Sequence, residues 1–312
     1  MTADRVRTWL DAGELDLPLP GRGDTLTRWT SLAALTEIDV TAGRLAEAHV
    51  DATAILADLD GEPPTGGQLW GVWAAETPDA VVTARHGHGI ALEGLKAWCS
   101  GAGLCTHALV TARRGDGARG LYAVDLASPG VGVEPSSWQN AGMLGSDTRS
   151  VRFQNATAVP IGGPGAYLSR AGFWHGAVGV AACWLGGARA VAGPLYRAVG
   201  DPAAPASADP HAQAHLGAVD AVVAAAEATL ALAARTIDSD PDDPGAELIA
   251  RRVRAVVEHA VDEAITRTGR ALGPGPLALD GTHARRVADL TMYVRQSHAE
   301  RDLAALGRLA AR

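Results

Sequence analysis

The chain has 312 residues, which is enough for a sizeable buried core and for two or three structural units. Its hydrophobic content of 47% is ordinary for a soluble globular protein, and its formal net charge of -8 disfavours a nucleic-acid-binding protein. Three cysteines at irregular spacings fit neither a disulfide framework nor a zinc site. No export signal opens the sequence, so we expect a cytoplasmic protein without a membrane span.

The sequence divides into three segments with different residue patterns. The first, residues 1–62, is predicted to be helical. Residues 3–12 form a short predicted helix, and the apolar residues between Asp24 and Leu59 recur at the spacing of two further helices. The Pro- and Gly-rich residues 60–67 predict the end of this unit.

The second segment, residues 63–160, consists of short runs rich in Val, Leu and aromatic residues, separated by Gly, Pro and Asp. The expected strands cover residues 69–74, 80–83, 89–92, 108–112, 121–125, 130–133 and 151–155. Short strands at this spacing are typical of an antiparallel barrel or sandwich.

The third segment, residues 161–312, returns to a helical pattern. The predicted helices cover residues 168–199, 211–238, 245–270 and 283–311. The first of them is strongly apolar, and its glycines, among them Gly186 and Gly187, predict close approach of neighbouring helices. Four consecutive helices after a strand-rich unit predict an α+β protein, with a helical bundle packed against a barrel.

One strand-rich stretch carries a candidate for cofactor chemistry. Gly94 and Gly101 flank Trp98 and Ser100, which predicts a glycine-turned loop that places an indole beside a hydroxyl. An indole can cover one face of a planar ring, and a hydroxyl can hydrogen-bond a ring nitrogen. The stretch therefore indicates a site for a flat heteroaromatic cofactor. The alternative is that Trp98 is a core aromatic between ordinary turns.

Two groups of histidines could support other chemistry. His211 and His215 share one face of a predicted helix near Asp209, but a third ligand at matching spacing is missing, so no metal site is predicted. In the last predicted helix, His298 and two nearby carboxylates form either a general base or a solvated charged face.

The order and spacing of four motifs resemble the acyl-CoA dehydrogenase family. These are the segment from Gly94 to Ser100, the strand ending in Ala112-Arg113, the segment from Gly142 to Thr148, and the strand ending in Val159-Pro160. The resemblance covers about residues 65–200. It implies a helical N-terminal domain, here reduced to residues 1–62, a middle antiparallel β-barrel over 63–160, and a C-terminal four-helix bundle over 161–312.

The resemblance also implies a cofactor and a reaction. Members of the family bind FAD and desaturate acyl thioesters: a base removes the α-proton while the flavin accepts a hydride from the β-carbon. The residues that match the cofactor contacts of the family are Trp98, Ser100, Glu76, Thr77, Gly273 and Gly275. Trp98 is expected to pack against the flavin ring, and Ser100 to contact its reactive nitrogen.

The catalytic base has no obvious counterpart. The family's usual glutamate, near the start of the last helix, corresponds to Ser297, so His298 is the first candidate and Glu300 the second. Other members carry the base on the first bundle helix, where this chain has Trp174 and His175. Trp174, His175 and Ser297 are therefore expected to contact substrate.

The resemblance leaves three functions open. The first is an FAD-dependent dehydrogenase acting on an acyl thioester of CoA or of a carrier protein, with a flavoprotein or oxygen as electron acceptor. The second is a flavin-dependent monooxygenase of the same fold. The third is a non-catalytic subunit of a heteromeric dehydrogenase, which the shortened N-terminal domain favours. A homodimer or tetramer, or a hetero-oligomer, is the implied assembly.

Overall fold

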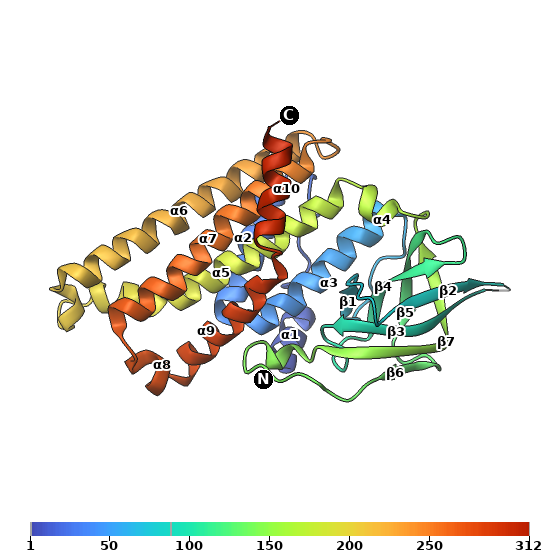
Figure 1. Ribbon diagram of the computed structural model, residues 1–312, viewed down its shortest axis with the longest axis horizontal. Coiled ribbons are helices and arrows are strands. Elements are labelled where there is room, and N and C mark those ends of the chain that lie inside the picture. The colour runs from blue at the N-terminus through green and yellow to red at the C-terminus, as the bar shows by residue number, and fades with distance from the viewer. Residues whose placement is uncertain (1, 88, 312) are drawn as a thin grey trace. The chain divides into compact units, whose positions relative to one another are not determined.

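A computed structural model describes residues 2–87 and 89–311, and the contacts within it define two compact units (Figure 1). Unit 1 is drawn from Met1–Leu17, Leu45–Gln139 and Leu144–Phe173. Unit 2 is drawn from Pro18–Arg44, Asn140–Met143 and Trp174–Arg312. Each unit therefore gathers segments that are far apart in the sequence.

Unit 1 contains the predicted barrel. Its strands are β1 (Trp70–Trp73), β2 (Val82–His86), β3 (Ile90–Cys99), β4 (His107–Arg114), β5 (Arg119–Asp125), β6 (Val131–Val133) and β7 (Arg149–Ile161). Pairing runs β4-β2-β3-β7-β5 and returns from β5 to β4, which closes the ring, while β1 joins β4 and β6 joins β7. The ring is antiparallel except where β2 meets β4, and the added β1 also pairs with β4 in parallel.

Successive side chains of each strand point to opposite faces, and the barrel therefore has two apolar surfaces. Trp73, Leu92, Val110 and Phe153 belong to one buried cluster of strand residues. The other surface packs against helix α3 (Val40–Asp58), whose residues from Leu45 onward belong to unit 1, and against α4 (Ala166–Ser169). Helix α1 (Thr2–Asp11) completes the unit.

His49, on α3, should make the stability of unit 1 sensitive to acid. Its ring is 5% exposed, and its Nδ1 accepts a hydrogen bond from the Trp70 N–H at 3.2 Å. Burial lowers the pKa of His49 to about 4, although the Asp16 carboxylate opposes this shift. Because the unfolded chain binds this proton more readily, stability is complete above about pH 6.5 and falls as the pH drops toward 4, by roughly 3 kcal/mol in total.

Urea unfolding at pH 7 and pH 5 checks this expectation in wild type and in His49→Gln. Wild type should lose about 2 kcal/mol more than the variant over this interval, because the variant has no proton to bind there. Equal losses would show that His49 does not titrate differently in the folded and unfolded chains.

Unit 2 is the predicted helical bundle. Its helices are α2 (Thr25–Ile38), α5 (Gly172–Gly200, from Trp174 onward in this unit), α6 (Pro210–Ser239), α7 (Ala246–Leu272), α8 (Gly275–Leu279), α9 (Gly281–Tyr293) and α10 (Glu300–Ala310). The two 3-10 turns η2 (Pro205–Ser207) and η3 (Val294–Gln296) lie between them. The α+β fold with a β-barrel and a helical bundle is thus confirmed.

Helices α5 and α6 are long and apolar enough to cross a membrane by length and composition alone. Within the fold, 78% of the apolar window of α5 is buried, against 28% for α6. The core helix of a soluble protein meets the same criteria, so the pattern is weak evidence for a span.

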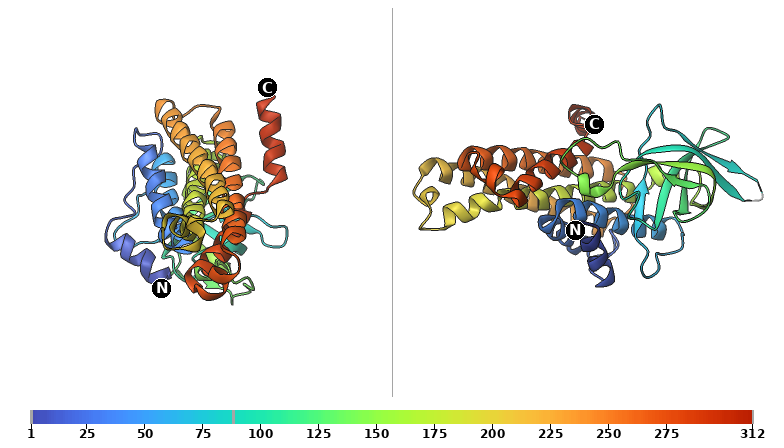
Figure 2. Two further views of the ribbon diagram at one scale, coloured as in Figure 1. Left: turned by 90° about the vertical axis from the view of Figure 1, so that its left-hand side faces the viewer. Right: turned by 90° about the horizontal axis from the view of Figure 1, so that it is seen from below.

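The prediction of one continuous last helix is wrong. The chain leaves helical geometry after η3, and α10 starts only at Glu300. Ser297 is extended, with ψ 144, and Ala299 has φ 46, outside the helical region. The Ala299 N–H donates to the Ser297 Oγ and the His298 N–H donates to the Asp302 carboxylate, so side chains satisfy the freed backbone groups. Helix α10 has no buried residues and stands at the outside of unit 2 (Figure 2, left).

Candidate functional site

The predicted loop around Trp98 is wrong for Gly94 to Cys99, which belong to strand β3, whereas Ser100 and Gly101 do lie in the turn that follows it, where Gly101 has φ 74. Gly94 has φ 126 and pairs with Val82 of β2, where a Cβ would overlap the Val81 carbonyl oxygen. The glycine therefore permits close approach of two strands rather than a turn. The register of β3 against β7 shifts between Lys96 and Cys99, which marks a bulge.

Trp98 lies in this bulge with φ 61, and its indole is 54% exposed. A positive φ is uncommon for a bulky residue, and bulges of this kind re-aim a side chain away from the regular strand. Trp98 is therefore not a core aromatic: the backbone turns a large apolar ring toward solvent. An exposed indole on a rigid strand is suited to cover a planar ligand.

A group of hydroxyls begins at Ser100, two residues after Trp98 in the chain. The Thr148 Oγ1 donates to the Ser100 Oγ at 3.1 Å and lies 2.7 Å from the Ser146 Oγ. The Gly101 N–H donates to the Ser146 carbonyl oxygen at 2.7 Å, which joins the end of β3 to the 3-10 turn η1 (Leu144–Ser146). The structure thus brings together two of the motifs that carried the resemblance, and their hydroxyls can donate to and accept from a polar ring edge.

A second indole, which the sequence analysis did not predict, lies next to Trp98. The ring of Trp138 stands at 86° to that of Trp98, with their centroids 6.1 Å apart. Trp138 lies in an irregular stretch after β6, among Pro, Ser, Gln and Asn, and a large aromatic in so polar a segment was the available signal. The two rings form a right-angled aromatic pair.

Glu76 and Thr77, predicted to contact the cofactor, lie between β1 and β2 in unit 1. The Glu76 carboxylate accepts from Arg119 at 2.9 Å and lies 3.8 Å from the Arg113 guanidinium. Thr77 pairs with Ala80 in an isolated β-bridge. Near Glu76, the buried Lys96 ammonium donates to the carbonyl and hydroxyl oxygens of Thr111, and burial lowers the pKa of Lys96 to about 8. Glu76 is therefore paired with two arginines, and its predicted contact with the cofactor stays a prediction.

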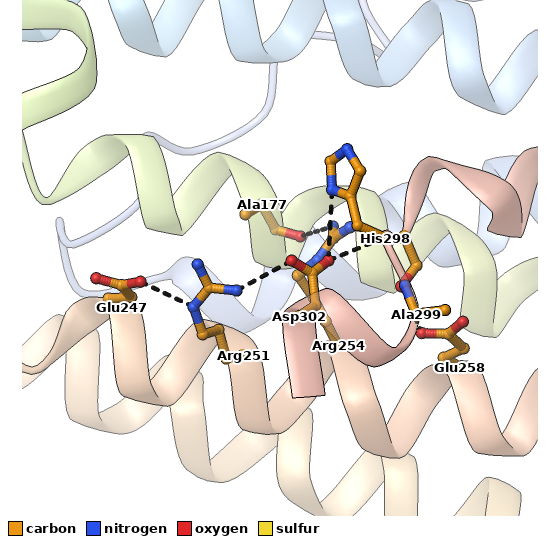
Figure 3. A network of polar contacts seen from close by, with 9 residues as sticks. Ala177, Glu247, Arg251, Arg254, Glu258, His298, Ala299 and Asp302 are labelled. Atoms are coloured by element: carbon orange, nitrogen blue, oxygen red, sulfur yellow. Dashed lines mark hydrogen bonds and ion pairs between the residues drawn. The ribbon is translucent and has the colours of Figure 1, made fainter. Parts of the chain in front are cut away.

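Unit 2 contains a polar cluster around the break before α10 (Figure 3). The Ser297 hydroxyl, on a side chain that is 8% exposed, donates to the Glu258 carboxylate of α7 at 2.6 Å. Glu258 was not among the predicted site residues, because nothing in the sequence relates it to a residue 39 positions away. The cluster places a carboxylate next to the residue that matched the family's base.

The rest of the cluster is organised by Asp302 and Arg251. Asp302 accepts from Arg251 at 3.1 Å and from the His298 N–H at 3.0 Å, and the His298 Nδ1 lies 3.7 Å away (Figure 3). Burial alone would raise the pKa of Asp302, but these donors hold it below its ordinary value. The His298 side chain itself is 62% exposed, and Glu300 is also exposed.

The other predicted residues of unit 2 lie in α5 and at the junction of α7 and α8. Trp174 lies under Arg251, whose guanidinium carbon is 5.0 Å from the ring centroid. His175 is buried in α5. Gly273 ends α7 with φ 66, and Gly275 begins the short helix α8. Among residues 2–87 and 89–311, no group of three or more His, Cys, Asp or Glu side chains is arranged to hold a metal ion.

No protein-family model matches the sequence, and no curated protein matches it by sequence. Solved structures do match. Butyryl-CoA dehydrogenase from Megasphaera elsdenii is 17% identical with a TM-score of 0.83, covering 98% of this chain and 89% of its own. Nitrososynthase from Micromonospora carbonacea var. africana is 20% identical with a TM-score of 0.79, covering 99% and 92%. Dibenzothiophene monooxygenase from Paenibacillus sp. A11-2 is 18% identical with a TM-score of 0.78, covering 98% and 94%.

These likenesses define the class of the fold. The chain has the acyl-CoA dehydrogenase fold, as the motifs predicted. Proteins with this fold include dehydrogenases and oxygenases, and the monooxygenase from Paenibacillus has also been solved with FMN and indole. At 17–20% identity the likeness concerns the fold, so the reaction must be argued from this chain's own residues.

Proposed function

We propose that the protein is a flavin-dependent oxidoreductase. One feature of unit 1 supports this proposal. The Trp98 indole is exposed on β3, the Ser100 and Thr148 hydroxyls are hydrogen-bonded to each other just beyond the end of that strand, and the Trp138 ring stands at a right angle to that of Trp98. An isoalloxazine ring is planar and apolar on its faces and carries hydrogen-bonding atoms on its edge, so these residues fit it. Trp98 would hold the ring face, and Ser100 would hold the edge.

The finer proposal is α,β-desaturation of an acyl thioester. A bound flavin supplies the hydride acceptor for this reaction, and the protein must supply a group that takes the α-proton. The cluster at the start of α10 contains groups of the right kind, including His298, Glu300 and Glu258. Fold similarity to butyryl-CoA dehydrogenase supports this choice of substrate class.

Anaerobic addition of butyryl-CoA and longer acyl-CoA thioesters to the flavin-loaded protein tests the desaturation. The visible absorption of the flavin should bleach with at least one thioester, because hydride transfer reduces it. A flavin that stays oxidised with every chain length would contradict the proposal. In that case, recovery of bleaching on co-expression with a full-length relative would assign the chain a subunit role.

A monooxygenase is the second candidate, because Ser297 occupies the place of the usual carboxylate and two fold neighbours are oxygenating or nitrogen-oxidising enzymes by name. This candidate predicts that the protein consumes oxygen when given chemically reduced flavin and an aromatic heterocycle such as indole. The two candidates are therefore separated by whether a thioester or oxygen changes the flavin spectrum.

FAD is the predicted cofactor, and FMN is the alternative that the FMN-bound neighbours introduce. Chromatography of the flavin released from the purified protein distinguishes them. We further propose a homodimer or tetramer in the cytoplasm, which light scattering of the purified protein tests for the oligomer.

A further inference from the structure

We propose that Glu258 is the final acceptor of the substrate's α-proton and that Ser297 carries the proton to it. This inference rests on the proposed desaturation and adds the proton pathway that the sequence did not supply. The positions of both residues are set within unit 2, Glu258 by helix α7 and Ser297 by the break between η3 and α10.

The hydrogen bonds of the Ser297 hydroxyl leave room for one incoming proton. Its hydrogen is directed at the Glu258 Oε2 at 2.6 Å, and one of its lone pairs accepts the Ala299 N–H at 3.1 Å. A hydroxyl has two lone pairs, so one is still able to accept. An O–H donor this close to a carboxylate has the length of a strong charge-assisted bond, which suits transfer of the hydroxyl proton to Glu258.

The backbone at this place is unusual in a way that a purely helical segment would not need. Ala299 has φ 46 and ψ -119, a conformation that costs a non-glycine residue about 1–3 kcal/mol. It interrupts the helix so that Ser297 is held inward against α7 while His298 points outward. Conformations of this kind persist where surrounding contacts hold them, and they concentrate at functional sites.

The other candidate bases are less suited to the role. His298 is 62% exposed, where water competes for any proton it takes. Glu300 is exposed as well. Asp302 is engaged by Arg251 and by the His298 N–H, which lower its pKa and make it a weaker base. The buried Ser297 hydroxyl, backed by a half-buried carboxylate, lacks these disadvantages.

The proposed transfer moves one proton from the substrate to Ser297 and one proton from Ser297 to Glu258. As the Cα–H bond of the thioester breaks, its electron pair stays on the substrate and its proton bonds to the Ser297 Oγ. The original hydroxyl proton moves to the Glu258 Oε2 in the same step. Ser297 ends as a hydroxyl and Glu258 as a neutral carboxylic acid, and reversal of the step exchanges the substrate's α-proton with solvent.

Deuterium exchange into the α-position of butyryl-CoA, followed by mass spectrometry, tests this pathway in the anaerobic flavin-loaded protein. Glu258→Gln keeps the size and an oxygen acceptor for Ser297, yet exchange should fall about 100-fold or more with little change in the Kd for butyryl-CoA. The exchange rate of Ser297→Ala should fall by a similar factor. Glu263→Gln, which breaks an ion pair with Arg267 further along α7, is the matched control and should exchange like wild type.

A rescue variant separates a proton-accepting role from a structural one. The double variant Glu258→Gln, Ser297→Glu moves the carboxylate from position 258 to position 297. Its exchange rate should be at least about tenfold higher than that of Glu258→Gln alone. Unchanged exchange in Glu258→Gln, beside an active wild type, overturns this inference alone. An equally low rate in the rescue variant also counts against it. Absence of exchange in flavin-loaded wild type with every thioester overturns the desaturation itself and this pathway with it.

Discussion

Gly186→Ala is expected to destabilise the protein by about 3 kcal/mol or more, a larger loss than overpacking usually causes. Gly186 lies in α5 where α2 crosses it, and a Cβ there would overlap the Ala33 carbonyl oxygen and lie 2.8 Å from its carbon. These are backbone atoms of a neighbouring helix, so the clash is relieved only if one helix moves. Small residues at helix contacts have this effect because they let two backbones approach.

Gly217→Ala is the matched control, since Gly217 also lies within a helix but has open space around its missing Cβ. Alanine should stabilise α6 there by about 0.5–1 kcal/mol, because glycine loses more conformational freedom on folding. Thermal and urea unfolding of the two variants should therefore shift in opposite directions. A Gly186→Ala variant as stable as wild type would show that α2 and α5 do not pack as closely as the structure has them.

Trp98→Ala should weaken flavin binding by about 10- to 100-fold, the range that loss of one aromatic stacking surface typically causes. The fold should survive, because the indole is half-exposed and contributes little to the core. Trp98→Phe, which keeps an aromatic face, should lose much less. Titration of flavin into the refolded or flavin-depleted protein, followed by fluorescence, gives the Kd of each variant.

Leu279→Ala is the control for loss of an exposed apolar side chain, since Leu279 of α8 is 88% exposed and lies in unit 2. Its flavin affinity should equal that of wild type. Trp138→Ala should show an intermediate loss if the right-angled pair of rings acts as one surface. Full flavin occupancy in Trp98→Ala at micromolar protein concentration would show that Trp98 does not contribute to flavin binding.

Much of the fold was predictable because its signals are local. The long helices α5, α6 and α7 follow from apolar periodicity and lie within a few residues of their predicted limits. Most strands follow from short β-branched runs, but β3 and β7 extend well beyond the predicted 89–92 and 151–155. Closure of the barrel, with β2 and β4 parallel, was not predictable, because strand pairing across long separations leaves no mark in a single sequence.

The two errors around the site have physical causes. Gly94 was interpreted as a turn, but its positive φ serves a close strand contact that only the fold reveals. The last helix was predicted to continue because Val294 and Leu303 fit one apolar stripe and neither Gly nor Pro interrupts it. The acidic residues Glu300 and Asp302, typical of a helix first turn, were the signal that α10 starts there.

The candidate site was predictable in part. The motifs indicated Trp98 and Ser100, and the structure adds the exposure of the indole and the hydroxyl contact with Thr148. Trp138 and Glu258 come from segments without a recognisable motif, and each reaches its partner only through the fold. Residues that complete a site from distant segments are therefore the ones that sequence patterns miss.

The visible absorption spectrum of the protein purified without added cofactor tests the central claim most directly. We expect the spectrum of a bound oxidised flavin, or its appearance at a stoichiometry near one per chain after reconstitution with FAD or FMN, and we expect it to weaken in Trp98→Ala. A protein that is folded by circular dichroism, yet binds neither flavin at micromolar concentrations, would contradict the account.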